Sequence, residues 1–256
     1  MKLLRKLRRA LLDSDPSFCD MYEDAHARSA AQEYLGHIRR YLRESFNDQK
    51  LDILDAGCQA GRLLIPLAED GHRLTGVDTS GFALRRAKRH AQERKLPVQL
   101  HEGNISQVRR WIEPATLDVV ICAEVLYLCD NYGELLALLA ESVKPGGLLF
   151  ISHRPTVFYA AVALKQGKPE LAASVAGRNE GKSPDGEYHN WQMPEQLEEL
   201  YTWLGLTVLA CEPVDHALFP VNPAAAGPDV ARLLETVSRE GSALRVPQYF
   251  LVTAQK

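Results

Sequence analysis

One short stretch of the chain has residue types and spacing that suit it to bind a nucleoside. Residues 51–80 read as a buried strand, a turn that contains Gly57 and Gly61, a helix, and a second strand that ends at Asp78. Glycine lets the backbone approach a ligand closely, and the first turn of a helix offers unpaired N–H groups. An acid about 20 residues beyond such a turn can accept hydrogen bonds from ribose hydroxyls. The pattern therefore predicts a nucleoside-containing cofactor.

The glycine spacing narrows the choice of cofactor. A dinucleotide fingerprint has the pattern G-x-G-x-x-G, which brings the backbone against a pyrophosphate. In DAGCQAG, residues 55–61, Gly57 and Gly61 are four positions apart. This spacing disfavours NAD and FAD, so a nicotinamide oxidoreductase is only a distant alternative.

The composition is that of an ordinary globular protein. The chain has 256 residues, of which 46% are hydrophobic and 25% are charged, and this is enough for one large domain with a core. No apolar run approaches the roughly 20 residues that a membrane span needs. The five cysteines are scattered without a CxxC pair, and no HxH or HExxH spacing occurs, so we expect no metal site and a cytoplasmic protein.

Charge is unevenly distributed along the chain. The formal net charge is −3, although residues 1–12 contribute five basic side chains and no acidic one, so the remainder is acidic. A basic N-terminal helix of this kind can contact RNA, an anionic membrane surface or an acidic partner. It can equally be a solvated helix that packs its leucines on the domain. The acidic body makes a nucleic-acid partner an unfavoured alternative that the sequence does not exclude.

Short apolar runs alternate with helical patterns, which favours an α/β fold with a parallel sheet. We expect a doubly wound, seven-stranded, mostly parallel sheet with an N-terminal helical cap and an insertion after the fifth strand. The expected segments are a cap at 1–48, a cofactor-binding core at 49–153, a substrate-side insertion at 154–190 and the C-terminal part of the same core at 191–256. The expected strands are 51–57, 74–78, 98–101, 117–122, 148–153, 207–211 and 249–253.

Taken together, these motifs resemble those of the class I S-adenosylmethionine-dependent methyltransferases, over roughly residues 45–155. Residues 55–61 match the family's acid-x-Gly-x-Gly-x-Gly turn except that Gln59 replaces the middle glycine. Residues 103–105 (GNI) fall where the family contacts adenine, and residues 121–128 look like its fourth motif. Gln59 either adapts, by donating its amide to the cofactor or the substrate, or weakens cofactor binding.

The resemblance implies S-adenosyl-L-methionine as the cofactor. It implies that Asp78 holds the ribose, although an acid at the end of a strand can also be only a helix cap. The residues that the resemblance assigns to cofactor binding are Asp55, Gly57, Gln59, Gly61, Asp78, Thr79, Asn104, Ile105, Cys122 and Glu124.

Methyl transfer from a sulfonium is an in-line displacement, so a protein mainly positions the acceptor and removes its proton. Histidine is the natural base near neutral pH. The residues predicted to act in catalysis are His153, His189 and Tyr127. Those predicted to contact the substrate are Tyr22, His26, Arg154, Tyr188 and Trp191. The histidines can instead be structural, and Tyr188 and Trp191 can instead pack the insertion onto the domain.

The function that these patterns favour is methyl transfer to an oxygen or nitrogen of a small-molecule acceptor. The fourth motif reads CAEV at 122–125, not the Asn/Asp-Pro-Pro-Tyr/Phe of base-amine methyltransferases, which disfavours a nucleobase as acceptor. Two alternatives stay open. One is an RNA or protein methyltransferase that docks through the basic N-terminal helix, and the other is a non-catalytic binding subunit. We expect a monomer or a homodimer.

Overall fold

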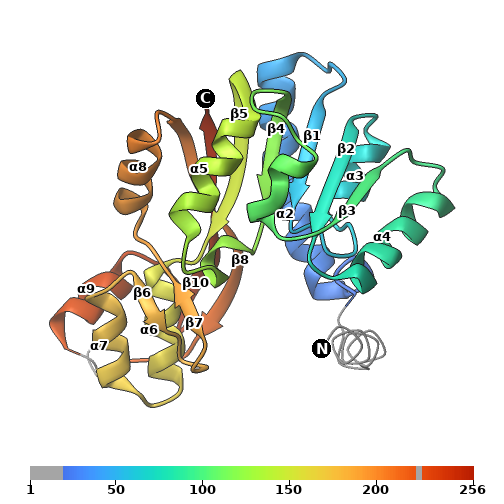
Figure 1. Ribbon diagram of the computed structural model, residues 1–256. Helices are drawn as coiled ribbons and strands as arrows, with labels where there is room; N and C mark the ends of the chain where they lie inside the picture. The colour runs from blue at the N-terminus through green and yellow to red at the C-terminus, as the bar shows by residue number, and fades with distance from the viewer. Residues whose placement is uncertain (1–19, 223–226) are drawn as a thin grey trace, which may run out of the picture.

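A computed structural model describes residues 20–222 and 227–256 of the chain (Figure 1). The basic segment at residues 1–12 lies outside the described residues. The first described helix, α2 (Ala25–Phe46), is longer than the apolar pattern at 31–45 indicates. It begins earlier because Asp24 caps it, accepting a hydrogen bond from the Ala27 N–H at 2.8 Å.

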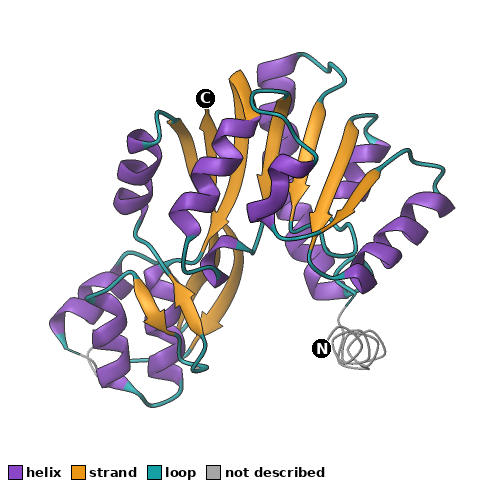
Figure 2. Cartoon of the chain, viewed as in Figure 1, coloured by secondary structure: helices purple, strands orange, loops and turns teal. Residues whose placement is uncertain are grey.

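A single large sheet forms the centre of the described fold (Figure 2). Strands β1 to β5 run parallel, and β10 runs antiparallel between β5 and β8, in the order β3-β2-β1-β4-β5-β10-β8. The predicted doubly wound, mostly parallel sheet is confirmed, and short β9 adds a further strand beside β10. The bounds are β1 (Asp52–Ala56), β2 (Arg73–Asp78), β3 (Gln99–Glu102), β4 (Leu117–Cys122), β5 (Val143–His153), β8 (Thr207–Phe219), β9 (Ser238–Glu240) and β10 (Ala243–Gln255).

Helices cover both faces of this sheet. Neighbouring residues Ile53 and Leu54 are both buried, but in different clusters, because successive side chains of a strand point to opposite faces. The first face carries α2, α3 (Leu64–Glu69) and α4 (Gly81–Glu93), and the second carries the 3₁₀ helix η1 (Ile105–Arg110), α5 (Tyr132–Ser142) and α8 (Pro194–Trp203).

A second lobe extends from one end of the sheet, at the lower left of Figure 1. It has its own hydrophobic cluster, to which Trp191 and Phe219 belong, and it includes the far ends of β8 and β10. The predicted division of the chain into four segments stays a prediction. The lobe combines residues 156–191 with residues 219–222 and 227–246. Its other elements are α6 (Thr156–Lys165), α7 (Pro169–Ala176), β6 (Glu180–Lys182), β7 (Tyr188–Asn190) and α9 (Pro228–Glu235).

The last two long strands depart from the sequence prediction. Both β8 and β10 have 13 residues, far more than the expected 207–211 and 249–253. Pro213 and Pro247 lie just outside the expected strands, and proline donates no ladder hydrogen bond. The prolines are tolerated because β8 lies at the edge of the sheet, and Pro247 lies where β10 has passed the end of β5.

None of the helices in the described parts of the chain is long and apolar enough to cross a membrane.

Candidate active site

The turn after β1 is held in a left-handed backbone conformation. Gly57, Gln59 and Gly61 have φ angles of 87°, 44° and 92°. The Gly57 N–H donates to the Val77 carbonyl at 2.7 Å, and a Cβ placed on Gly57 would overlap the side chain of Val125. Only glycine therefore fits at position 57, both for its backbone angle and for the space available.

Gln59 occupies its left-handed position with its side chain turned toward the N-terminal segment. Its Oε1 accepts hydrogen bonds from the Ala60 N–H at 2.8 Å and from the Met21 N–H at 3.2 Å. Two backbone donors thus hold the amide, and they tie the turn to the residues that precede α2. Whether Gln59 also contacts the cofactor stays a prediction.

Asp78 ends β2 directly opposite the turn. Its Oδ2 accepts a hydrogen bond from the Gln59 N–H at 2.9 Å, and its Oδ1 accepts one from the Ser80 N–H at 2.8 Å. Ser80 in turn caps α4. Because a carboxylate offers about four lone-pair sites, two bonds to the backbone orient Asp78 and leave each oxygen able to accept a further donor.

Two adjoining cavities lie at the carboxyl ends of β1, β2 and β4, where ligands bind in open α/β sheets. They share Gly57, Asp78 and Val125. The larger, of about 260 Å³, is lined by polar groups that include Asp55, Gln59, Arg62, Asp78 and Glu124, together with Met21 and Tyr127. The smaller, of about 110 Å³, is lined by Thr79, Gly103, Asn104, Ile105, Cys129 and Leu135.

Asp55 is a buried acid at the base of the larger cavity, with 3% of its surface exposed. Burial raises the pKa of Asp55 to about 7, and the nearby Asp78 charge adds to this, whereas the Arg62 guanidinium opposes it. The carboxyl is therefore poised to ionise when a cationic group approaches it.

A chain of charged and phenolic groups runs from the larger cavity into the protein. Arg62 pairs with Glu124 at 2.6 Å, and Glu124 accepts a hydrogen bond from the Tyr249 hydroxyl at 3.0 Å. That hydroxyl accepts one from Arg154 at 2.8 Å. Sequence reasoning missed Arg62 and Tyr249. Arg62 directly follows the last glycine of the turn, whereas no local signal marks Tyr249, which the antiparallel strand β10 brings in from the end of the chain.

Arg154 lies among aromatic rings next to Tyr127. Its guanidinium carbon is 4.9 Å from the Tyr127 ring centroid, 4.4 Å from that of Phe158 and 3.9 Å from that of Tyr249. Cation–π attraction and the hydrogen bonds of the guanidinium hold this cation in place. The predicted substrate residue Arg154 and the predicted catalytic residue Tyr127 thus lie side by side, and of the two Tyr127 lines the larger cavity.

The comparisons with known proteins agree with this geometry. A family model described as a methyltransferase domain matches residues 53–147. The chain is 30% identical over 119 residues to the ubiquinone biosynthesis O-methyltransferase of Rickettsia canadensis, which is 46% of this chain and 49% of that protein. It is 28% identical over 153 residues to the enzyme of the same name from Rickettsia typhi, which is 59% of this chain and 58% of that protein. The chain thus spans about half the length of the curated relatives it matches.

The solved structures share the fold. An S-adenosylmethionine-dependent methyltransferase from Mesorhizobium loti matches with a TM-score of 0.56 at 18% identity, over 85% of this chain and 96% of that one. Residues 53–147 are therefore similar to a methyltransferase domain, and the described fold is that of the class I S-adenosylmethionine-dependent methyltransferases. The 1,6-didemethyltoxoflavin-N1-methyltransferase of Burkholderia thailandensis matches with a TM-score of 0.58 at 19% identity, over 98% of this chain and 89% of that one.

The predicted cofactor residues lie mostly around the two cavities. Gly61 closes the left-handed turn, and nearly all of the others line one of the two cavities. Cys122 is the exception, because it is completely buried in the hydrophobic cluster on the second face of the sheet. Asn104 lines the smaller cavity and also caps η1, with its Oδ1 accepting from the Ser106 N–H at 2.9 Å.

The two predicted histidine bases differ in their surroundings. His189 lies near Tyr127, with ring centroids 5.3 Å apart, and its Nδ1 is 2.5 Å from the Tyr159 hydroxyl. Burial lowers its pKa, with a smaller contribution from Arg154, so the imidazole is neutral near pH 7. His153 is fully buried and bonds the Tyr201 hydroxyl at 2.9 Å, and burial lowers its pKa to about 4.

His153 contacts neither cavity, because strand alternation turns it toward α8. Its neighbour Ser152 lies on the other face and accepts a hydrogen bond from the Glu124 N–H at 2.6 Å. Burial of His153 leaves it no route to a substrate, so its position contradicts the predicted role as a base.

Several predicted substrate residues also lie outside the two cavities. Trp191 is fully buried in the second lobe, where its indole N–H donates to the Val175 and Arg178 carbonyls. Tyr188 hydrogen-bonds Glu180 on the neighbouring strand. Tyr22 stacks on His90 of α4, and His26 is an exposed residue whose Nε2 is 3.4 Å from Asp215. Each of these side chains has a structural partner in the fold.

One cluster of potential metal ligands occurs in the described residues, formed by Asp20, Glu23 and His90. Arg86 pairs with Asp20 at 3.0 Å, and Arg89 pairs with Glu23 at 2.9 Å. Arginine side chains therefore already provide the positive charge at this cluster.

Proposed function

We propose that this chain transfers the methyl group of S-adenosylmethionine to an oxygen or a nitrogen of a small-molecule acceptor. The observation that carries the proposal is Asp78, which two backbone N–H groups orient at the junction of the two cavities. Oxygen is the favoured acceptor atom, because the curated relatives are O-methyltransferases.

The residues present suit the cofactor. Asp78 would accept hydrogen bonds from the two ribose hydroxyls of the cofactor. Ile105 and Val125 would form apolar walls on which the adenine packs. Burial raises the pKa of Asp55 to about 7. Its carboxyl would pair with the ammonium group of the cofactor and would become ionised as it does so. When bound, S-adenosylmethionine supplies a methyl group made electrophilic by the positive sulfur.

The acceptor side of the proposal uses Tyr127 and His189. Tyr127 lines the larger cavity and would position a planar acceptor against its ring. His189 packs against Tyr127, and its Nδ1 shares a hydrogen bond with the Tyr159 hydroxyl. With Nδ1–H donating to the Tyr159 oxygen, the neutral imidazole would take the proton of an acceptor hydroxyl at Nε2, while Arg154 nearby would favour the resulting oxyanion.

Calorimetric titration with S-adenosylmethionine, S-adenosylhomocysteine and NAD tests the cofactor. We expect micromolar binding of the two adenosyl ligands and none of NAD. Transfer of a labelled methyl group is then measured with a panel of phenols, heterocyclic amines and total RNA. Labelling of a phenol supports the proposal, and labelling of RNA alone supports the alternative that uses the basic N-terminal segment. Cofactor binding without transfer to any acceptor supports the non-catalytic binding subunit.

We also propose a cytoplasmic location and a monomeric or homodimeric state. Cell fractionation measures the location, and sedimentation equilibrium measures the state of assembly.

A further inference from the structure

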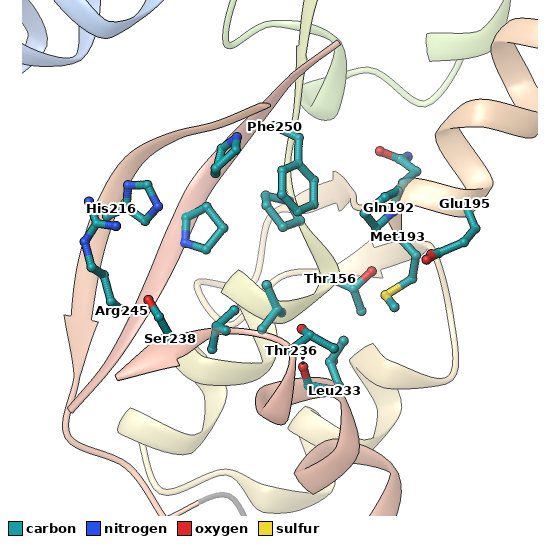
Figure 3. Close-up of a pocket in the computed structure, with 16 residues that line it drawn as sticks. Thr156, Gln192, Met193, Glu195, His216, Leu233, Thr236, Ser238, Arg245 and Phe250 are labelled. Atoms are coloured by element: carbon teal, nitrogen blue, oxygen red, sulfur yellow. Dashed lines mark hydrogen bonds between the residues drawn. The ribbon is translucent and has the colours of Figure 1, made fainter. Parts of the chain in front are cut away.

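A third and larger cavity, of about 410 Å³, lies between the second lobe and the sheet (Figure 3). It is bounded by the starts of α6 and α8, the end of α9 and the far parts of β8 and β10. It shares no lining residue with the two adjoining cavities at the ends of β1, β2 and β4, which we call the cofactor cavities. Its volume falls within the range of about 300 to 1,000 Å³ that is typical of small-molecule sites.

This cavity lies on the opposite face of β10 from the cofactor cavities. Tyr249 hydrogen-bonds Glu124 on the first face, whereas its neighbour Phe250 lines the third cavity. The chain alternates in the same way after β5, where Arg154 bonds Tyr249 and its neighbour Pro155 lines the third cavity. A ligand bound here would therefore not compete with the cofactor for space.

The lining has an apolar middle and a charged group at each side. Phe250, Leu233 and prolines occupy the middle, with Arg245 and His216 at one side and Glu195 at the other (Figure 3). Arg245 is exposed and has no ion-pair partner among the described residues. Burial and the Arg245 charge lower the pKa of His216, so near pH 7 the positive charge at that side is that of Arg245.

Three buried polar atoms of residues that line this cavity have no hydrogen-bond partner in the described parts of the chain. They are Oγ1 of Thr156, Oε1 of Gln192 and Nδ1 of His216, and Thr156 and Gln192 have only 3% and 2% of their surface exposed. Buried polar atoms in native proteins are almost always hydrogen-bonded, to protein, ligand or ordered water. The three atoms come from different parts of the lining, so a ligand with polar groups at this cavity could satisfy them.

We propose that the third cavity is a second binding site, which takes an amphipathic small molecule with an apolar body and a carboxylate. The apolar body lies against Phe250 and Leu233, and the carboxylate pairs with Arg245. Thr156 and His216 hydrogen-bond to polar groups of the ligand.

Calorimetry on the full chain tests the site, with decanoate as the probe and decanol as the neutral probe of matched length. We expect decanoate to bind more tightly, and we expect saturating S-adenosylhomocysteine to leave its affinity unchanged. Competition between the two would place decanoate in the cofactor cavities and overturn the proposal. Failure of decanoate to bind at its solubility limit would also overturn it, and would indicate that water alone fills the cavity.

Variants then locate the probe. Arg245→Gln should weaken decanoate about fivefold, the range of an exposed ion pair, and should leave decanol unchanged. Arg239→Gln is the matched control, because Arg239 is an exposed arginine on adjacent β9 that does not line the cavity. Equal losses in the two variants would contradict the proposed role of Arg245.

A cavity-filling change provides an independent check. Val237→Phe places a ring in the cavity and should abolish binding of both probes, with the melting temperature confirming that the variant folds. Ser238→Phe, at an exposed lining residue, serves the same purpose if Val237→Phe does not fold. Unchanged decanoate binding in the folded variant would overturn the assignment of the probe to this cavity.

Discussion

The cofactor end of the sheet and the second lobe are held by different kinds of contact. At the cofactor end, backbone N–H groups of the turn donate hydrogen bonds to residues of the next strand along the chain. The Gln59 N–H, for example, donates to Asp78 at the end of β2. In the second lobe, side chains from distant segments pack together, as Phe158 does on Phe219 with ring centroids 6.0 Å apart.

The glycines show the same difference. Gly57 and Gly167 both have positive φ angles, of 87° and 69°. A Cβ on Gly57 would overlap Val125, whereas one on Gly167, between α6 and α7, would meet nothing within 4 Å. The cofactor end therefore depends on backbone conformation and close approach, and the second lobe depends on side-chain burial. Four variants, each read against the wild type, test this distinction.

Gly57→Ala should have the largest effect. The new methyl group meets Val125 and the backbone is strained, so cofactor affinity should fall by more than about 100-fold in titration calorimetry. Gly167→Ala, at a positive φ in open space, should cost only about 1 kcal/mol of folding free energy and leave cofactor affinity unchanged. Equal losses of affinity in the two variants would remove the distinction between the regions.

Asp78→Ala should weaken S-adenosylhomocysteine about 100-fold, because two hydrogen bonds to a charged acceptor are lost at about 1.5 kcal/mol each. Asp130→Ala removes the same charge near the same edge of the sheet, at an exposed residue that lines neither cofactor cavity. That control should bind normally. Unchanged affinity in Asp78→Ala would exclude Asp78 from the cofactor site.

Trp191→Phe should separate stability from binding. It leaves the Val175 and Arg178 carbonyls without their indole donor and creates a small void, at a cost of about 2 kcal/mol measured by urea unfolding. Cofactor affinity should not change. Trp203→Phe, at a residue with 82% of its surface exposed, should have no measurable effect on either quantity. A loss of cofactor affinity in folded Trp191→Phe would show that the second lobe supports the cofactor site.

Asp55→Asn should have an effect that is visible in the pH dependence of stability. The folded pKa of Asp55, about 7, lies above the unfolded value of 3.8, so the folded state binds the proton more tightly. The wild type should therefore lose stability relative to Asp55→Asn as the pH rises from about 4 to about 7. Urea midpoints of the cofactor-free protein measure this. Parallel profiles of the two proteins would contradict the raised pKa.

The sequence was most informative where contacts are local. The turn at Gly57 and Gly61, the acid at Asp78 and the cap at Ser80 could all be predicted, because each lies beside a strand end or a helix start. The parallel strands β1, β2 and β4 could be placed within about two residues, since their mostly buried residues form short apolar runs.

The acceptor side could be predicted only in part. Tyr127 and Arg154 do lie together, but the pairing of Arg154 with Tyr249 depends on β10 lying beside β5. His153 was misplaced because side chains alternate along a strand, and a single position decides which face a residue reaches. The sequence marked the end of β5 but did not indicate which of Ser152, His153 and Arg154 face the cofactor.

What the sequence by itself determined is the resemblance to methyltransferases over residues 45–155, the succession of the parallel strands along the chain and the glycine turn after β1, because these depend on backbone preferences and short-range periodicity. The tertiary structure alone decided three things: the chain of contacts from Arg62 to Arg154, the burial of Trp191 and His153, and the third cavity beneath Phe250. The physical reason is that each requires two antiparallel strands from the end of the chain to pair in one register, and the free energy of that pairing comes from packing between distant residues.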